Sequence, residues 1–201
     1  MKKFVNNLAI AIAFLFSAAS VNAQTPAAGS ITVTPMVGVN FTNLQGDNNQ
    51  TLDSKVGINV GAEALYMCND NIGISVGAMY SQQGCKVKDT TLGIDYVNVP
   101  VMLNGYVAKG LALKAGVQAG FKVNDKATAN GVSVDLDTMS KLVGGDATVK
   151  SFDVSVPVGI SYEFKNIVLD ARANLGVISV FKDKNLSARN STVQLSLGYR
   201  F

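Results

Sequence analysis

The sequence of 201 residues contains no histidine, no tryptophan and only two cysteines. Without histidine the chain cannot form a Ser-His-Asp triad, activate water with an Asp-His pair, or bind a metal through imidazole. A hydrolase that used carboxylates alone would need two facing acids in a cleft, and the sequence places no such pair. We therefore expect no catalysis, no cofactor and no metal.

Charge is scarce too, because only 15% of the residues are Asp, Glu, Lys or Arg, against about 25% in soluble globular chains. The first 23 residues, MKKFVNNLAIAIAFLFSAASVNA, have the form of a signal peptide: two lysines, a short apolar run and small residues at a cleavage site. We expect cleavage between Ala23 and Gln24, which leaves residues 24–201 as one domain with a formal charge of +1. So small a charge indicates no nucleic-acid partner.

The rest of the chain has no second long apolar run, which excludes a membrane protein built from helices. No cysteine follows the signal sequence directly, so a lipid-anchored lipoprotein is not expected. An exported chain that is apolar on average, yet lacks a spanning helix, fits a closed β-barrel, in which all backbone groups pair between strands.

Apolar and polar residues alternate along eight stretches. In the first, Val33, Val37 and Val39 share one face while Thr34 and Asn40 share the other. Each stretch is long enough to cross a bilayer as a tilted strand of about 9–11 residues, and an even number is typical of bacterial barrels. The predicted strands are 31–41, 55–67, 72–83, 95–107, 111–123, 149–163, 167–181 and 191–201.

The connections between these strands alternate in length. The short turns are 68–71, 108–110 and 164–166, and the longer loops are 42–54, 84–94, 124–148 and 182–190. Outer-membrane barrels have short periplasmic turns and long extracellular loops. We therefore predict an all-β fold: an eight-stranded antiparallel up-and-down transmembrane barrel in the outer membrane of a Gram-negative bacterium, surrounded by outer-membrane lipid and lipopolysaccharide.

The polar face of the strands distinguishes this barrel from a soluble, lipocalin-like barrel with the same period. That face consists mostly of Gly, Ser, Thr, Asn and Gln, with few Lys or Glu, which is a poor coat for a surface in water. Glycines such as Gly61, Gly116 and Gly120 recur on it. They leave room for larger side chains in a narrow lumen.

Aromatic residues of the apolar face gather at both strand ends, where the two membrane interfaces favour them. The predicted girdle at the long-loop ends comprises Phe41, Tyr80, Phe121, Phe152 and Phe181. The girdle at the short-turn ends comprises Tyr66, Tyr162, Tyr199 and Phe201. A closing strand that ends in Tyr199 and Phe201 also resembles the C-terminal signal of outer-membrane proteins, so we expect the barrel-assembly machinery as a partner during insertion.

Four stretches carry a resemblance to a known family: YVNVPVMLNGY (96–106), FDVSVPVGISYEF (152–164), IVLDARANLGV (167–177) and VQLSLGYRF (193–201). The first is similar to a motif of the PorT-like outer-membrane β-barrel family of the Bacteroidetes, and the others to that family's last three strands. Asn98 departs from the motif, which usually has an acidic residue there. The resemblance covers nearly all of the mature chain and implies fold and location; a few family members belong to secretion or gliding systems.

Six charged residues fall on the inward face: Glu63, Lys114, Asp153, Asp170, Arg172 and Arg200. An unpaired charge is costly in a lumen of low dielectric constant. Three acids and three bases therefore predict a salt-bridge network that plugs the barrel, and the alternative is a proton or ion path. Met67, Met79 and Met102 are further inward candidates.

Three further predictions concern single features of the sequence. A whole strand of roughly 30 Å separates Cys68 from Cys85, so we expect two unbridged thiols, since a disulfide needs Cα atoms within about 7 Å. Within loop 124–148, VDLDTMSKLV has apolar residues at helical spacing and forms either a short amphipathic helix or a disordered segment. Thr90 and Thr138 stand in Asp-Thr motifs that resemble O-glycosylation sites of exported Bacteroidetes proteins.

Three functions are compatible with this sequence. The first is a plugged barrel with a structural role, or with loops that bind a surface ligand or partner protein. The second is a small pore or a carrier for apolar molecules, which needs an open lumen or a lateral gap. The third is an accessory subunit of a secretion system.

Overall fold

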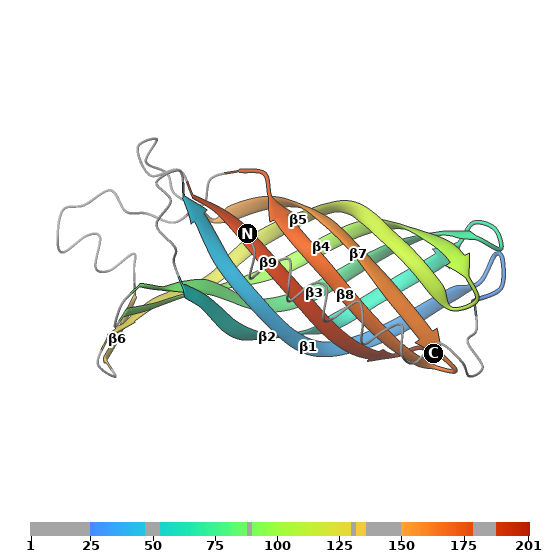
Figure 1. Cartoon of the computed structure of the whole chain (residues 1–201), viewed down its shortest axis with the longest axis horizontal. Coiled ribbons are helices and arrows are strands. Elements are labelled where there is room, and N and C mark those ends of the chain that lie inside the picture. The colour runs from blue at the N-terminus through green and yellow to red at the C-terminus, as the bar shows by residue number, and fades with distance from the viewer. Residues whose placement is uncertain (1–24, 47–52, 88–89, 130–131, 136–149, 179–187) are drawn as a thin grey trace.

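The structure, a computed structural model, describes residues 25–46, 53–87, 90–129, 132–135, 150–178 and 188–201. Within these ranges eight antiparallel strands form a barrel, and a short ninth strand, β6, pairs with the last residues of β5 (Figure 1). The strands are β1 (Ile31–Gly46), β2 (Asp53–Met67), β3 (Ile72–Val87), β4 (Thr90–Ala108), β5 (Leu111–Ala129), β6 (Val132–Asp135), β7 (Phe152–Phe164), β8 (Ile167–Gly176) and β9 (Ala188–Tyr199). The predicted eight-stranded up-and-down barrel is confirmed. Among the described residues, no helix has the length and apolar character to cross a membrane.

The barrel closes between its first and last strands. Neighbouring strands follow the order β1-β2-β3-β4-β5-β7-β8-β9, and β9 pairs with β1. The register of this seam places Met36 opposite Gly198. Beyond it, Val33 and Phe201 exchange two backbone hydrogen bonds with N···O distances of 3.4 and 2.9 Å. Phe201 therefore extends the ladder past the end of β9.

Side-chain exposure alternates along the strands in the sense that a membrane barrel requires. On β1, Val37 is 58% exposed, whereas Met36 and Asn40 on the opposite face are buried. A rise of about 3.3 Å per residue and a tilt of about 40° turn the stretch from Ile31 to Phe41 into a height of about 25 Å, which matches the apolar band of outer-membrane barrels. The apolar face is the outer wall and the polar face lines the lumen.

Several strands extend further than the sequence predicts, at the end of the barrel that carries the long connections (Figure 1). β3 and β4 stay paired as far as Val87 and Thr90, so the predicted loop 84–94 is largely a β-hairpin. The predicted loop 124–148 begins with the last residues of β5 and the hairpin that β5 forms with β6. Outside a membrane neither face of a strand pair has to be apolar, so the period-2 signal stops while the backbone ladder continues.

Two predicted strands are shorter than expected, and a segment for which a helix or disorder was predicted begins in a strand. The stretches 149–163 and 167–181 form strands only from Phe152 and only to Gly176. Val134 and Asp135, the first residues of the segment VDLDTMSKLV, lie in β6, where alternating valines favour a strand. The rest of that segment, including Thr138, lies outside the described residues, as do Ala23, Gln24 and Phe181.

Aromatic residues occupy both ends of the outer wall. Phe121 and Phe152 lie opposite each other on β5 and β7, with ring centroids 5.4 Å apart, at the long-connection end. Tyr199 and Phe201 are 4.8 Å apart at the short-turn end. Of the other predicted girdle residues, Tyr66 is exposed, and Phe41 and Tyr80 are partly exposed.

Tyr162 departs from the predicted girdle, because it is only 5% exposed. It lies opposite the outward-facing Leu111, packs against the small Ala171, and is covered by Ile160 and Leu169 among others. Tyr162 and Ala171 together form a small buried apolar cluster in the wall. Tyr162 therefore stabilises the wall rather than facing lipid.

The remaining sequence features fall on opposite ends of the molecule. Cys68 is exposed and unbridged, in the turn between β2 and β3. Cys85 lies near the far end of β3, consistent with the prediction that the two thiols are too distant for a disulfide. Thr90 is the first residue of β4.

Replacing Phe201 by Asp should lower the amount of barrel that reaches the outer membrane, because a charge replaces an aromatic side chain at the membrane interface while the backbone bonds to Val33 are retained. Phe201→Tyr is the matched control and should insert normally. The measurement is the amount of heat-modifiable protein in isolated outer membranes. Equal amounts of Phe201→Asp and unmodified barrel would show that the side chain has no part in assembly.

Candidate functional site

Four charged side chains meet inside the barrel: Glu63 from β2, Lys114 from β5, and Asp170 and Arg172 from β8. We call them the lumen ion cluster. Lys114 Nζ lies 2.6 Å from Glu63 Oε1 and 2.9 Å from Asp170 Oδ2. Because β2 and β5 stand nearly opposite each other in the strand order, these contacts cross the lumen. The two acids and two bases of the cluster have no net charge.

Arg172 is the centre of the cluster and is only 1% exposed. Its Nε donates to Asp170 Oδ1 at 2.6 Å, and its Nη2 donates to Asp170 Oδ2 at 2.8 Å and to Glu63 Oε2 at 3.1 Å. Its Nη1 donates to the sulfur of Met102 at 3.4 Å. A bidentate contact between a guanidinium and a carboxylate is strong and fixes the orientation of both groups.

A glycine makes this arrangement possible. Gly159 on β7 is paired with Lys114 on one side and with Arg172 on the other. A Cβ at position 159 would lie 2.8 Å from Arg172 Cβ and 2.5 Å from the carbonyl oxygen of Ala171. Two long cationic side chains therefore fit on neighbouring strand positions because the residue between them has no side chain.

Arg200, one of the six predicted lumen charges, lies apart from the cluster. It forms an ion pair with Glu163 on β7, which we call the C-terminal ion pair. Its Nη1 also donates to Tyr106 Oη at 3.2 Å, and its Nε donates to Thr34 Oγ1 at 3.3 Å. The sequence prediction missed Glu163, although the alternation along β7 places it on the same inward face as Asp153.

Asp153, the sixth predicted charge, lies towards the long-connection end of the lumen. Asn190 Nδ2 donates to its Oδ2 at 3.4 Å, and its Oδ1 has no hydrogen-bond partner among the described residues. The structure thus brings four of the six predicted charges into one cluster and places Arg200 and Asp153 in separate contacts.

Uncharged polar side chains occupy another part of the lumen. Asn59 Nδ2 donates to Asn40 Oδ1 at 3.0 Å, and Asn40 Nδ2 donates to Ser81 Oγ at 2.8 Å. Ser196 Oγ donates to Asn59 Oδ1 at 2.9 Å. These bonds join β1, β2, β3 and β9. The predicted inward methionines Met67, Met79 and Met102 are all buried.

The charged groups of the lumen ion cluster pair with one another. Both carboxylates of the cluster accept hydrogen bonds from Lys114 and Arg172. In the part of the chain that the structure describes, no three His, Cys, Asp or Glu side chains gather in a way that would hold a metal ion. The arrangement joins β2, β5 and β8 through ion pairs inside the barrel.

Comparison with known proteins agrees with this geometry. The family described as outer membrane protein β-barrel domain matches residues 22–182. The chain belongs to this family. Its barrel therefore resides in the outer membrane of a Gram-negative bacterium, as predicted. A search of curated protein sequences finds no match.

Solved structures of small barrels are similar to this fold. Ail, the attachment invasion locus protein of Yersinia pestis, is 18% identical, with a TM-score of 0.53 over 85% of this chain and 98% of Ail. A second structure of Ail, in complex with the heparin analogue sucrose octasulfate, is 15% identical, with a TM-score of 0.52 over 86% and 99%. Neisserial surface protein A is 12% identical, with a TM-score of 0.55 over 85% and 97%. At these identities the likeness concerns the fold alone.

Replacing Arg172 by Ala should destabilise the barrel by about 3–5 kcal/mol, because Glu63 and Asp170 would keep buried charge with one cation removed. Unfolding by urea in lipid vesicles, followed as the loss of heat-modifiable mobility, gives the difference in free energy. Lys109→Ala removes an exposed cation from a turn and should change the free energy of unfolding by well under about 1 kcal/mol. If both variants behave alike, water solvates the cluster and the lumen is not dry.

Proposed function

We propose that this barrel is a plugged outer-membrane scaffold whose long connections bind a surface ligand or a partner protein, without catalysis. The lumen ion cluster carries this proposal. Eight strands leave an interior just wide enough for side chains to fill, and Arg172, Lys114 and their partners fill it with paired charge. With solute passage blocked, the part of the molecule open to solutes and partners outside the cell is its long-connection end.

The extent of that end favours binding through it. β4 and β5 are each 19 residues long, which exceeds the length of about 9–11 residues that crosses a bilayer. The excess forms a β-platform that, with β6, projects beyond the barrel wall (Figure 1). Ail, a barrel of similar fold, has been crystallised with a heparin analogue, so the fold is compatible with ligand binding.

The finer assignment is to the PorT-like barrels of the Bacteroidetes, on the four stretches that resemble their strands. That assignment would allow an accessory role in a secretion system, for which co-purification from native outer membranes is the test. The proposal includes a mature chain of residues 24–201 that follows a signal peptide and is inserted by the barrel-assembly machinery. Lipopolysaccharide would surround the long-connection end.

An epitope tag inserted between residues 136 and 149 should be labelled by antibody on intact cells, because long connections face outward in outer-membrane barrels. The control is the same tag inserted in the turn between Asn69 and Asn71, which should be labelled only after lysis. Flow cytometry measures both. The reverse pattern would show that the barrel has the opposite orientation.

The purified barrel should give no steady unit conductance in planar bilayers, because the lumen ion cluster and the uncharged side chains fill it. A porin of 16 strands, incorporated in the same bilayer, serves as a positive control for insertion and recording, since barrels of roughly 16–18 strands hold an aqueous channel. Reproducible steps of one size from the purified protein would favour the small-pore alternative and end the plugged-scaffold proposal.

A further inference from the structure

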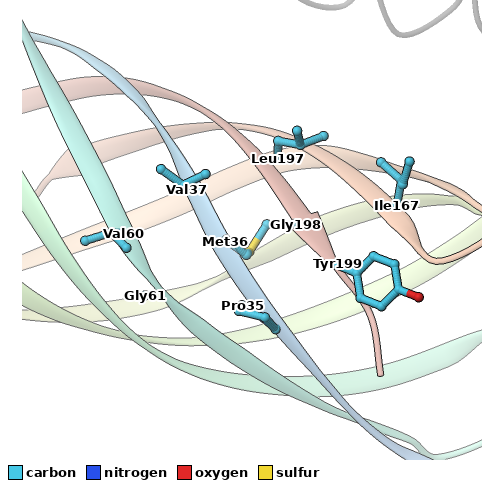
Figure 2. Close-up of a pocket in the computed structure, with 9 residues that line it drawn as sticks. All are labelled: Pro35, Met36, Val37, Val60, Gly61, Ile167, Leu197, Gly198 and Tyr199. Atoms are coloured by element: carbon cyan, nitrogen blue, oxygen red, sulfur yellow. The ribbon is translucent and has the colours of Figure 1, made fainter.

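The outer wall carries an apolar groove over the closing seam of the barrel. It is lined by Pro35, Met36 and Val37 of β1, by Val60 and Gly61 of β2, by Leu197, Gly198 and Tyr199 of β9, and by Ile167 of β8, and its volume is about 440 Å³ (Figure 2). Val37, Val60 and Leu197 are each about half exposed. The groove therefore opens outward, towards the membrane, and not into the lumen.

The sequence of β1 and its neighbours explains why the wall is thin here. Met36 points inward and is only 4% exposed, and its register partners are Gly61 on one side and Gly198 on the other. Because Met36 points inward and both of its neighbours are glycines, no side chain fills the outer surface at this level. The surface is therefore recessed between the outward-facing side chains at the adjacent positions. Met36 consequently forms the floor of the groove (Figure 2).

Pro35 adds a second local feature. Val33 donates its backbone N–H to Phe201, just beyond β9, and position 35, two residues further along β1, faces the same neighbouring strand. Proline has no N–H, so the seam lacks the bond that another residue would donate to β9. The pairing of β1 with β9 accordingly begins only at Met36. The groove thus lies where backbone pairing at the seam is weakest.

The position of the groove along the barrel identifies the surrounding solvent. Pro35 and Val37 lie a few residues above Ile31, the short-turn end of the apolar band. Tyr199, which pairs edge to face with Phe201, marks the interface end of the groove. The groove therefore opens into lipid hydrocarbon and continues towards the headgroup level, which is the path of an acyl chain.

We propose that this groove binds one acyl chain of a phospholipid and retains it longer than the lipid around it. A groove left empty against lipid would forfeit the dispersion contacts of its lining, and a flexible chain fills a shallow, curved groove better than a second copy of this wall. A second copy would fill the groove poorly. The middle of its wall offers only short aliphatic side chains such as Val76 and Val117, because its exposed aromatic residues lie at the barrel ends. The proposed orientation, with short turns in the periplasm, makes the lipid a phospholipid of the periplasmic leaflet. The groove itself depends only on the membrane location and not on the plugged lumen.

Native mass spectrometry of the barrel, extracted from membranes in mild detergent, should show one retained phospholipid per barrel. Val37→Phe places a ring in the groove and should reduce the retained fraction at least fivefold. Val117→Phe adds the same ring to β5, on another part of the lipid-facing wall, and should leave that fraction unchanged. Equal retention in the three proteins would overturn the proposal, as would a retained mass of lipopolysaccharide. A dimer of the unmodified barrel that becomes a monomer in Val37→Phe would also overturn it, because a second copy would then occupy the groove.

A second measurement keeps the test decisive if Val37→Phe fails to fold, which its heat-modifiable mobility would show. The unmodified barrel is placed in vesicles with a phospholipid that carries a photoreactive diazirine in its acyl chain. Crosslinks should concentrate on the groove residues, above all Met36 and Leu197, at several times the yield at Val76 or Val101. Uniform labelling of the outer wall would mean that the groove holds only exchanging bulk lipid. A conducting barrel would change neither readout. An inverted barrel would place the groove in the other leaflet, and the epitope-tag labelling would reveal that orientation, so failure of the proposed function is distinguishable from failure of this proposal.

Discussion

The constraint behind this structure is that lipid hydrocarbon offers no partner for a backbone N–H or C=O group. A chain without a spanning helix can satisfy those groups only by closing a sheet on itself, and β9 meets β1 for this reason. Closure then decides where side chains go, because successive residues point alternately to lipid and lumen. The valines of β1 and the polar side chains between them are two consequences of one requirement. The continued bonding of Phe201 to Val33 meets the same requirement beyond the end of β9.

Closure with eight strands also makes the lumen narrow, and narrowness governs its chemistry. A side chain that points inward meets side chains from across the barrel, so a buried charge there needs an opposite charge within reach. Arg172 satisfies this by contacting Asp170 on its own strand and Glu63 on β2. Gly159 is part of the same solution, since a side chain there would collide with Arg172 and with the backbone of Ala171. The glycines on the inward face are thus places where a neighbour's bulk is accommodated.

The period of two along the chain was sufficient to predict the fold, the two faces and the residues of the lumen ion cluster, because lipid acts on every position of a spanning strand. It did not predict the extensions of β3, β4 and β5, where a hairpin in water has no face that must be apolar. Tyr162 was misplaced because its burial depends on Ala171 of the neighbouring strand, and pairing between strands is not visible in the period. Glu163 lay on the predicted inward face and could have been found by following the alternation to the end of β7. Which partner each lumen charge takes depended on the register between strands, and sequence reasoning had no access to it.

Prolines show how closely the wall and its contents depend on each other. Besides Pro35 at the β1–β9 seam, Pro100 lies where the pairing of β3 with β4 skips from Val76 to Met79, and Pro157 where that of β5 with β7 skips from Ala115 to Gln118. A missing ladder bond within a membrane is costly, so these seams need support from elsewhere. Arg200 contacts Thr34, Tyr106 and Glu163, which belong to β1, β4 and β7, the three strands that contain a proline. The lumen ion cluster joins β2, β5 and β8. Two buried polar networks therefore hold different sets of strands together from inside, and the charged side chains that point into the lumen also stabilise the wall around it.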